Sequence, residues 1–221
     1  MHLAAIALYS AVFYVACARF VFHADTKTRS MRGARGRGVR RWWPELTFAV
    51  LWLAACAALS VTSLSHDVIW QLWIARQMLG GTDLYTGIIE VNPPLWFWMA
   101  LPVEWLARAT DIPAPRMMVA AMMAFAGLGL ALAATLLAHE TPRRRAAILF
   151  ALVLAFLVLL PLPDFAQREH ICLFGPMCYV LLAAQCADGR IVSLWQALAV
   201  GLLAAAGFAL KHYFVVVPVV L

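Results

Sequence analysis

Residues 46–64 read LTFAVLWLAACAALSVTSL, an apolar run without a charged side chain. A run of about 20 apolar residues is long enough for a helix to cross the hydrocarbon core of a bilayer. The next residues, 65–85, read SHDVIWQLWIARQMLGGTDLY, so an acidic residue, Asp67, follows the run almost directly. We therefore expect Asp67 at the end of a membrane helix, where the chain leaves the bilayer, followed by an aromatic-rich amphipathic segment.

The composition of the whole chain indicates a membrane protein. Apolar residues make up 65% of the 221 residues and charged residues 13%, against about half and about a quarter in soluble domains. The net charge of +6 does not indicate a nucleic-acid partner, because the basic residues cluster beside apolar runs, as a topology signal does. The five cysteines form no CxxC or Cys/His cluster, so neither a metal site nor a disulfide framework is predicted.

About six transmembrane helices are predicted, which makes the chain an all-α, polytopic membrane protein. The apolar runs cover residues 4–22, 46–64, 117–138, 146–162, 171–186 and 194–210. A further apolar run, 213–221, is cut by the end of the chain, so we expect a truncated protein. We divide the chain into residues 1–45, an N-terminal span with a basic cytoplasmic loop, and residues 46–221, the main transmembrane region.

The basic residues predict the orientation of these spans. Seven Lys and Arg residues lie between positions 27 and 41, a run of three arginines covers 143–145, and Arg190 lies between the last two spans. Alternate connections are thus basic, and the positive-inside rule places them in the cytoplasm. The connections 65–116 and 163–170 then face outward.

The outer connection 65–116 is long, and it is too apolar for a solvated linker. Residues 67–79 and 95–107 predict amphipathic helices that lie in the outer membrane interface. The rings expected at the headgroup level are Trp70, Trp73, Trp96 and Trp98. Gly80-Gly81 is expected to end the first helix with a left-handed cap, and Pro93-Pro94 to open the second.

The outer segments carry three motifs on one predicted side. The first comprises Asp67, Ala75-Arg76, Gly80-Gly81, Leu84-Tyr85, Glu90 and Asn92-Pro93-Pro94-Leu95; the second is Gln167-Arg168-Glu169-His170; the third is Lys211-His212. From about residue 46 onward, their order and spacing resemble the GT-C superfamily of membrane glycosyltransferases, above all bacterial members related to protein mannosyltransferases and lipid A aminoarabinose transferases. The chain departs from that pattern at Val68, where protein mannosyltransferases carry a second acidic residue, and in having fewer spans.

The resemblance implies a multi-pass enzyme of the bacterial inner (plasma) membrane with its active site facing the periplasm. Such enzymes transfer a sugar, with inversion, from a polyprenyl-phosphate carrier to a glycan, lipid or protein acceptor. Asp67 matches the catalytic position, as the base or as the carboxylate that orients the acceptor. The residues expected to bind substrate are Glu90, Arg168, Glu169, His170, Lys211 and His212. The resemblance requires no cofactor, although some GT-C enzymes use a divalent cation, to which Asp67 and Glu169 would contribute.

These residue types fit the chemistry of displacing a phosphate-linked sugar. A base is needed near the attacking hydroxyl, and cations are needed near the departing phosphate. Asp67 and Glu169 supply carboxylates, whereas Arg168, Lys211 and His212 supply cationic or hydrogen-bonding groups. Arginine in particular suits bidentate contact with a phosphate.

Simpler interpretations stay open for the same residues. Asp67 and Glu90 would then be solvated boundary residues, residues 168–170 a polar turn, and Lys211 a side chain that reaches the headgroups. Two other function classes also stay open: a transporter or flippase subunit, and a non-catalytic assembly partner in polysaccharide synthesis. A transporter would place ionisable groups near the bilayer midplane, whereas the spans predicted here are nearly free of charge.

Overall fold

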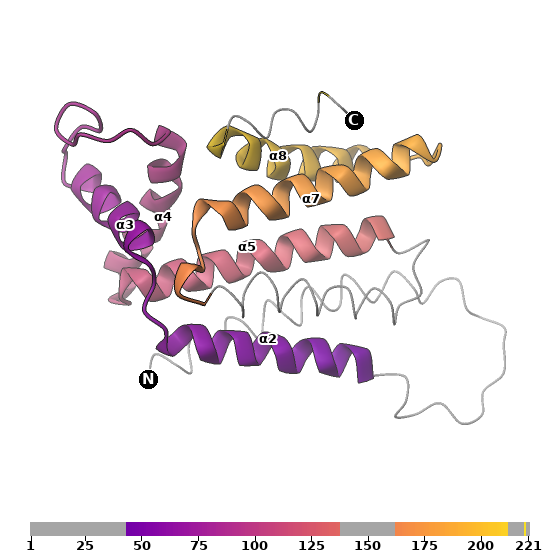
Figure 1. Cartoon of the computed structure of the whole chain (residues 1–221), viewed down its shortest axis with the longest axis horizontal. Helices are drawn as coiled ribbons and strands as arrows, with labels where there is room; N and C mark the ends of the chain where they lie inside the picture. The colour runs from indigo at the N-terminus through magenta and orange to yellow at the C-terminus, as the bar shows by residue number, and fades with distance from the viewer. Residues whose placement is uncertain (1–42, 138–161, 212–218, 220–221) are drawn as a thin grey trace.

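The described part of the chain contains six α-helices and one 3-10 helix, arranged as a bundle with a smaller helical unit at one end (Figure 1). The computed structural model describes residues 43–137, 162–211 and 219. The bundle helices are α2 (Trp43–Val61), α5 (Ala114–Leu137), α7 (Arg168–Ala187) and α8 (Leu194–Leu210). The end unit holds α3 (His66–Leu79) and α4 (Pro94–Thr110), and the 3-10 helix η2 (Leu162–Asp164) precedes α7. Since these residues form no strand beyond one isolated bridge, Leu84 to Ile88, the all-α prediction is confirmed for them.

Two described helices, α5 and α7, are long and apolar enough to cross a membrane. A third crossing is added if Phe48–Val61 and His66–Leu79, which are bent by 71° relative to each other, count as one span. Helix α8 is apolar but shorter. These helices agree with the prediction of a membrane protein. The predicted spans 4–22 and 146–162 and the basic segments 27–41 and 143–145 lie outside the described residues.

Local sequence signals account for where several helices begin and end. Helix α8 starts with a capping box, in which the Ser193 and Gln196 side chains each accept a bond from the other residue's backbone N–H. Helix α4 starts at Pro94, after Pro93 as its N-cap, because proline lacks the N–H that a first helical turn leaves unpaired. After α3, Gly80 keeps a right-handed geometry, and the left-handed residue is Gly81, with φ of 93°.

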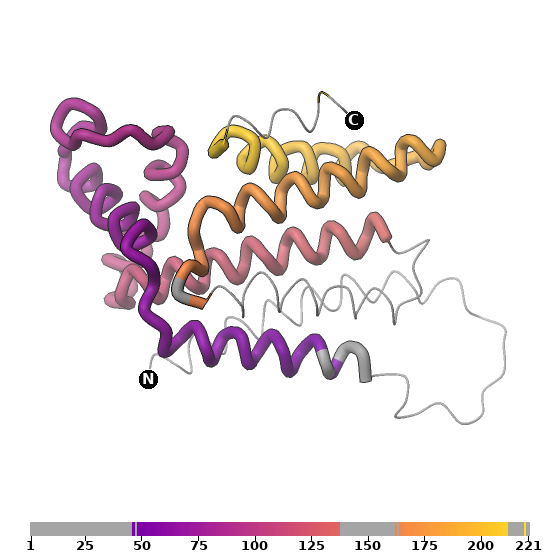
Figure 2. Tube along the Cα trace, viewed as in Figure 1, coloured from indigo at the N-terminus to yellow at the C-terminus, as the bar shows by residue number. Residues whose placement is uncertain are grey.

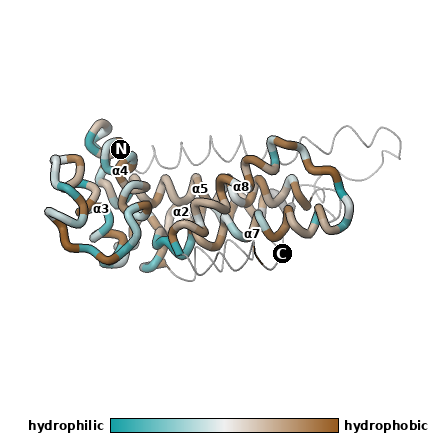
Figure 3. Tube along the Cα trace, turned by 90° about the horizontal axis from the view of Figure 1, so that it is seen from above, coloured by the Kyte–Doolittle hydropathy of each residue, from teal (hydrophilic) through white to brown (hydrophobic). Residues whose placement is uncertain are grey.

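The path of the chain brings the predicted outer segments to one end of the bundle. Helix α2 runs toward the α3–α4 unit, α5 and α7 run away from it, and α8 returns toward it (Figure 2). The α3–α4 unit, the start of α7 and the end of α8 therefore lie at the same end. The turn between α7 and α8, which contains Arg190, lies at the opposite end. Figure 3 shows hydrophilic residues mostly at these two ends, with apolar helices between them.

The α3–α4 unit is held together by a buried carboxylate. The side chain of Glu104 on α4 is 1% exposed, and its Oε1 lies 2.6 Å from Nε of Arg76 on α3 and 3.5 Å from Nε of Arg108. The Arg108 guanidinium also donates to the Arg76 carbonyl at 3.0 Å. A second tie between the helices is the buried Gln71 amide, which donates to the carbonyl of Trp96. Helix α4 packs in turn on α5, so the unit is fixed to the bundle.

Candidate active site

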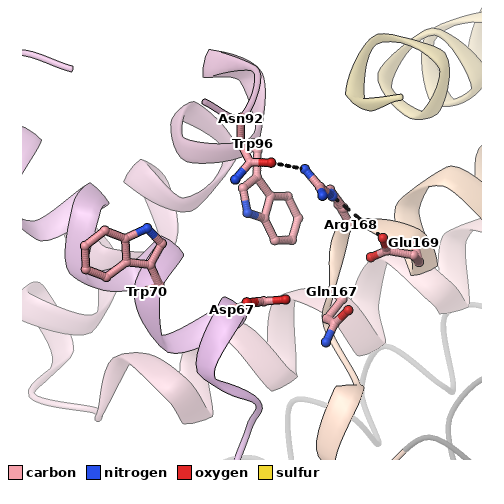
Figure 4. Close-up of a pocket in the computed structure, with 7 residues that line it drawn as sticks. All are labelled: Asp67, Trp70, Asn92, Trp96, Gln167, Arg168 and Glu169. Atoms are coloured by element: carbon pink, nitrogen blue, oxygen red, sulfur yellow. Dashed lines mark hydrogen bonds and ion pairs between the residues drawn. The ribbon is translucent and has the colours of Figure 1, made fainter. Parts of the chain in front are cut away.

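A pocket of about 180 Å³ lies where α3, the segment before α4 and the start of α7 come together (Figure 4). The side chains that line it are Asp67, Trp70, Asn92, Trp96, Gln167, Arg168 and Glu169. The pocket thus joins segments of the chain that are about a hundred residues apart in sequence.

Asp67 enters the pocket from the first turn of α3. A carboxylate is favoured there, because the unpaired N–H groups and the helix dipole make a helix N-terminus partly positive. The Asp67 side chain is exposed, and Figure 4 shows its carboxylate pointing from α3 toward the start of α7. Among the described residues, no hydrogen bond or ion pair occupies this carboxylate. Both of its oxygens are therefore open to a ligand.

The start of α7 forms the opposite wall. Gln167 is the N-cap residue of α7, with extended backbone geometry, and it follows Ala166, whose φ of 73° turns the chain sharply. The Gln167 amide donates to the Asp164 carboxylate at 2.9 Å and to the Ser65 hydroxyl at 3.1 Å. Since Ser65 is the N-cap of α3, this amide brings the first turns of α3 and α7 together.

Arg168, the first residue of α7, is linked to both sides of the pocket. Its Nη1 donates to Oδ1 of Asn92, which lies just before α4. Its Nε lies 3.7 Å from Oε1 of Glu169, and the same carboxylate oxygen lies 2.5 Å from Nζ of Lys211 at the end of α8. A continuous polar path therefore runs from Asn92 through Arg168 and Glu169 to Lys211.

Glu90 is the acceptor at the other end of this path. Its Oε2 accepts the indole N–H of Trp70 at 2.7 Å. Its Oε1 accepts the backbone N–H groups of Val91 and Asn92 at 2.7 and 3.0 Å and the Asn92 side-chain amide at 2.9 Å. Burial disfavours the charged form of Glu90, but these hydrogen bonds outweigh it and hold the pKa of the carboxyl below its usual value.

Aromatic rings complete the pocket. The rings of His66, Trp70 and Trp73 stack along α3, with centroid distances of 6.4 Å for the first pair and 4.8 Å for the second. Trp96 is 5% exposed, whereas Trp98, also on α4, is 52% exposed. Residues two positions apart on a helix face different sides. Trp96 therefore lines the pocket, and Trp98 lies on the outer surface.

The structure brings together some of the predicted site residues and separates others. Asp67, Arg168 and Glu169 line one pocket, and Lys211 reaches it through Glu169. Glu90 does not line the pocket but contacts two residues that do. The predicted substrate ligand His170 is buried and packs edge-to-face on Phe165, away from the lining, and His212 lies outside the described residues.

Four lining residues were missed as site residues by the sequence-based prediction. Asn92 and Gln167 stand within the motifs that carry the family resemblance, so their amides were a signal that could have identified them. Trp70 and Trp96 were assigned to the headgroup level, because a tryptophan ring in an amphipathic helix fits both environments. Only the packing of α3 and α4 decides between those two environments.

The pocket places a proton acceptor and a fixed cation side by side. Within the described residues, no three His, Cys, Asp or Glu side chains come together as a metal site. The pocket combines one carboxylate without a partner, Asp67, with a guanidinium that Asn92 and Glu169 hold in place. An acceptor of protons and a fixed cation in one small pocket are the groups needed to deprotonate a hydroxyl and to stabilise a departing anion.

Comparisons of the chain with family models, with curated proteins and with solved structures find no match.

Proposed function

We propose that the protein is a GT-C-type membrane glycosyltransferase, which transfers a sugar from a polyprenyl-phosphate donor to a glycan, lipid or protein acceptor at the outer face of a bacterial plasma membrane. The observation that carries the proposal is the pocket shared by Asp67 and Arg168. The Asp67 carboxylate has no partner among the described residues, and Asn92 and Glu169 hold the Arg168 guanidinium in the same pocket. They match the base and the phosphate-binding cation that this reaction needs.

The reaction assigns a role to each side of the pocket. The acceptor hydroxyl oxygen attacks the anomeric carbon of the donor sugar, and Asp67 takes the hydroxyl proton or orients the hydroxyl. The bond between the anomeric carbon and the phosphate oxygen breaks, and the polyprenyl phosphate leaves with the electron pair. Arg168 and Lys211 stabilise that charge. Attack and departure on opposite faces of the sugar invert the configuration.

The proposal extends to the membrane arrangement. In it, about six helices cross the bilayer, and α3 and α4 lie in the outer interface, with the pocket opening toward the periplasm. The bend of 71° between α2 and α3 supports this, because a helix continuing from a span at that angle runs closer to the membrane plane than to its normal. The exposed rings of Trp73, Trp98 and Trp105 suit the headgroup region, where tryptophan is favoured.

Replacement of Asp67 tests the proposal. Asp67→Asn keeps the shape of the side chain and removes its charge, so the protein should fold while transfer falls about a hundred- to ten-thousand-fold, the usual contribution of a positioned acid–base group. Asp83→Asn, an exposed carboxylate in the loop after α3, is the matched control and should keep wild-type transfer. Glu169→Gln should fall between the two.

The measurement is sugar transfer from a polyprenyl-phosphate donor in membranes, with the amount of each variant determined by immunoblotting. Wild-type turnover in Asp67→Asn would remove this residue from the mechanism. It would also favour the alternative of a non-catalytic assembly partner in polysaccharide synthesis.

A further inference from the structure

The hydrogen bonds of Glu90 use most of the acceptor positions of its carboxylate. A carboxylate offers about four lone-pair positions, two on each oxygen. Oε1 accepts three bonds, from the Val91 and Asn92 backbone and the Asn92 amide, and Oε2 accepts one, from the Trp70 indole. Because Glu90 does not line the pocket, its effect on the pocket passes through the groups it holds.

Two of those groups line the pocket. Trp70 contributes its ring and Asn92 its side chain. Because the Asn92 amide nitrogen is directed to Glu90, its oxygen faces the other way and accepts from Arg168. One carboxylate thus sets the position of an aromatic wall, the orientation of an amide and, through that amide, the position of the guanidinium.

The backbone around Glu90 is restrained as well. The Tyr85 hydroxyl donates to the Asn92 carbonyl at 2.6 Å, and the Tyr85 backbone N–H donates to the carbonyl of Ile88 at 2.9 Å. Pro93 and Pro94 follow directly and limit the backbone angles. The segment 85–94 is therefore a closed loop with Glu90 at its centre.

We propose that Glu90 is a positioning residue: its carboxylate fixes Trp70 and Asn92, and through Asn92 the guanidinium of Arg168, in the wall of the pocket. The effect of this role on turnover rests on the proposed transfer activity. The role itself does not, because the same hydrogen bonds restrain the loop whatever the pocket binds.

A double-variant experiment separates positioning from direct substrate contact. In Glu90→Gln the amide oxygen can still accept the three bonds from Val91 and Asn92, but its NH₂ group then faces the indole N–H of Trp70, donor against donor. Trp70→Phe removes that indole N–H. If Glu90 acts by positioning, Glu90→Gln should raise the donor KM about tenfold, the effect of losing one hydrogen bond to a charged group. In the Trp70→Phe background, the same substitution should change the donor KM little, so the KM of Trp70→Phe/Glu90→Gln should stay close to that of Trp70→Phe alone.

Asp83→Asn is the matched control. Asp83 is an exposed carboxylate in the same connection between α3 and α4, and it does not line the pocket. This variant should leave the donor KM unchanged. A KM for Trp70→Phe/Glu90→Gln that equals the product of the two single effects would overturn the positioning role.

Hydrogen–deuterium exchange tests the same inference without any transfer activity. In Glu90→Ala the amides of Val91 and Asn92 lose their acceptor, so they should exchange about tenfold faster than in the wild type, while the amides of α5 stay protected. Unchanged exchange at positions 91 and 92 would overturn the proposal. If the wild type shows no transfer but Glu90→Ala loses this protection, the proposed function fails and the positioning role stands.

Discussion

The carboxylates of Asp67 and Glu90 lie in neighbouring segments but differ in how their oxygens are used. Glu90 accepts four hydrogen bonds, whereas no described residue bonds to the Asp67 side chain. A group that acts on a ligand needs open lone pairs, whereas the bonds of Glu90 go to groups of the protein itself. We therefore assign the two acids separate roles, although both are carboxylates with the same predicted side of the membrane.

The hydrogen bonds to Glu90 should also make stability depend on pH. Because they hold its pKa in the folded protein below the ordinary value of 4.5, folding favours the ionised form. The stabilisation is complete above the pKa of the unfolded chain and is lost as the pH falls through the lower pKa of the folded protein. The groups that bond to Glu90 are an indole, an amide and two backbone N–H groups, none of which titrates in this range.

We therefore expect the difference in melting temperature between wild type and Glu90→Gln to shrink on acidification. Thermal unfolding in detergent, followed by circular dichroism from about pH 6 to about pH 3, measures this difference. Asp83→Asn serves as the reference for a carboxylate without these bonds. A difference that stays constant or grows toward acid would contradict the role of the Glu90 charge in folding.

At the scale of elements, the contact between α7 and α8 depends on glycine. A Cβ added at Gly175 would lie 2.5 Å from the backbone oxygen of Leu203 on α8, and one added at Gly207 would lie 2.9 Å from Cδ of Pro176. Neither neighbour is the end of a flexible side chain, so the helices would have to separate. Small residues that let backbones approach closely are a common means of packing membrane helices.

Gly175→Ala should therefore destabilise the protein by about 1–3 kcal/mol, the usual cost of overpacking. Gly201→Ala is the control on the same helix pair, because an added Cβ there meets nothing within 4 Å. It should be neutral or stabilising by about 0.5–1 kcal/mol, since alanine favours helix over glycine. Denaturant unfolding in micelles measures both, and equal effects of the two substitutions would show that α7 and α8 do not approach as closely as described.

For the whole molecule, the apolar runs predicted most of the described bundle. The runs 46–64, 117–138, 171–186 and 194–210 correspond to α2, α5, α7 and α8. In lipid, the backbone N–H and C=O groups of a segment must form hydrogen bonds with each other, so a long apolar run is expected to form a helix. The positions of the apolar runs are therefore enough to locate these helices.

The contacts that build the pocket could not be predicted in the same way. The bond between Asn92 and Arg168 joins residues 76 positions apart, and it depends on how α4 and α7 are rotated about their axes. Hydropathy carries no information on that rotation for helices that are apolar on most sides. The sequence predicted that Asp67, Arg168 and Glu169 share one side of the membrane, whereas the partners of Glu90 follow only from packing.

One end of the bundle holds the α3–α4 unit, the start of α7 and the end of α8. This arrangement leads to a topological prediction. Asp83, in the loop after α3, and Asp188, in the turn between α7 and α8, are both exposed and belong to opposite ends of the bundle. Arg190 lies in that same turn, and the positive-inside rule therefore predicts that the turn is cytoplasmic. In a variant without the five native cysteines, Asp83→Cys should react with a membrane-impermeant maleimide in intact cells, and Asp188→Cys only after permeabilisation. Labelling of both positions from outside would contradict the odd number of crossings predicted between them. Labelling of position 188 alone would place the pocket in the cytoplasm, where a transferase with a periplasmic active site could not work.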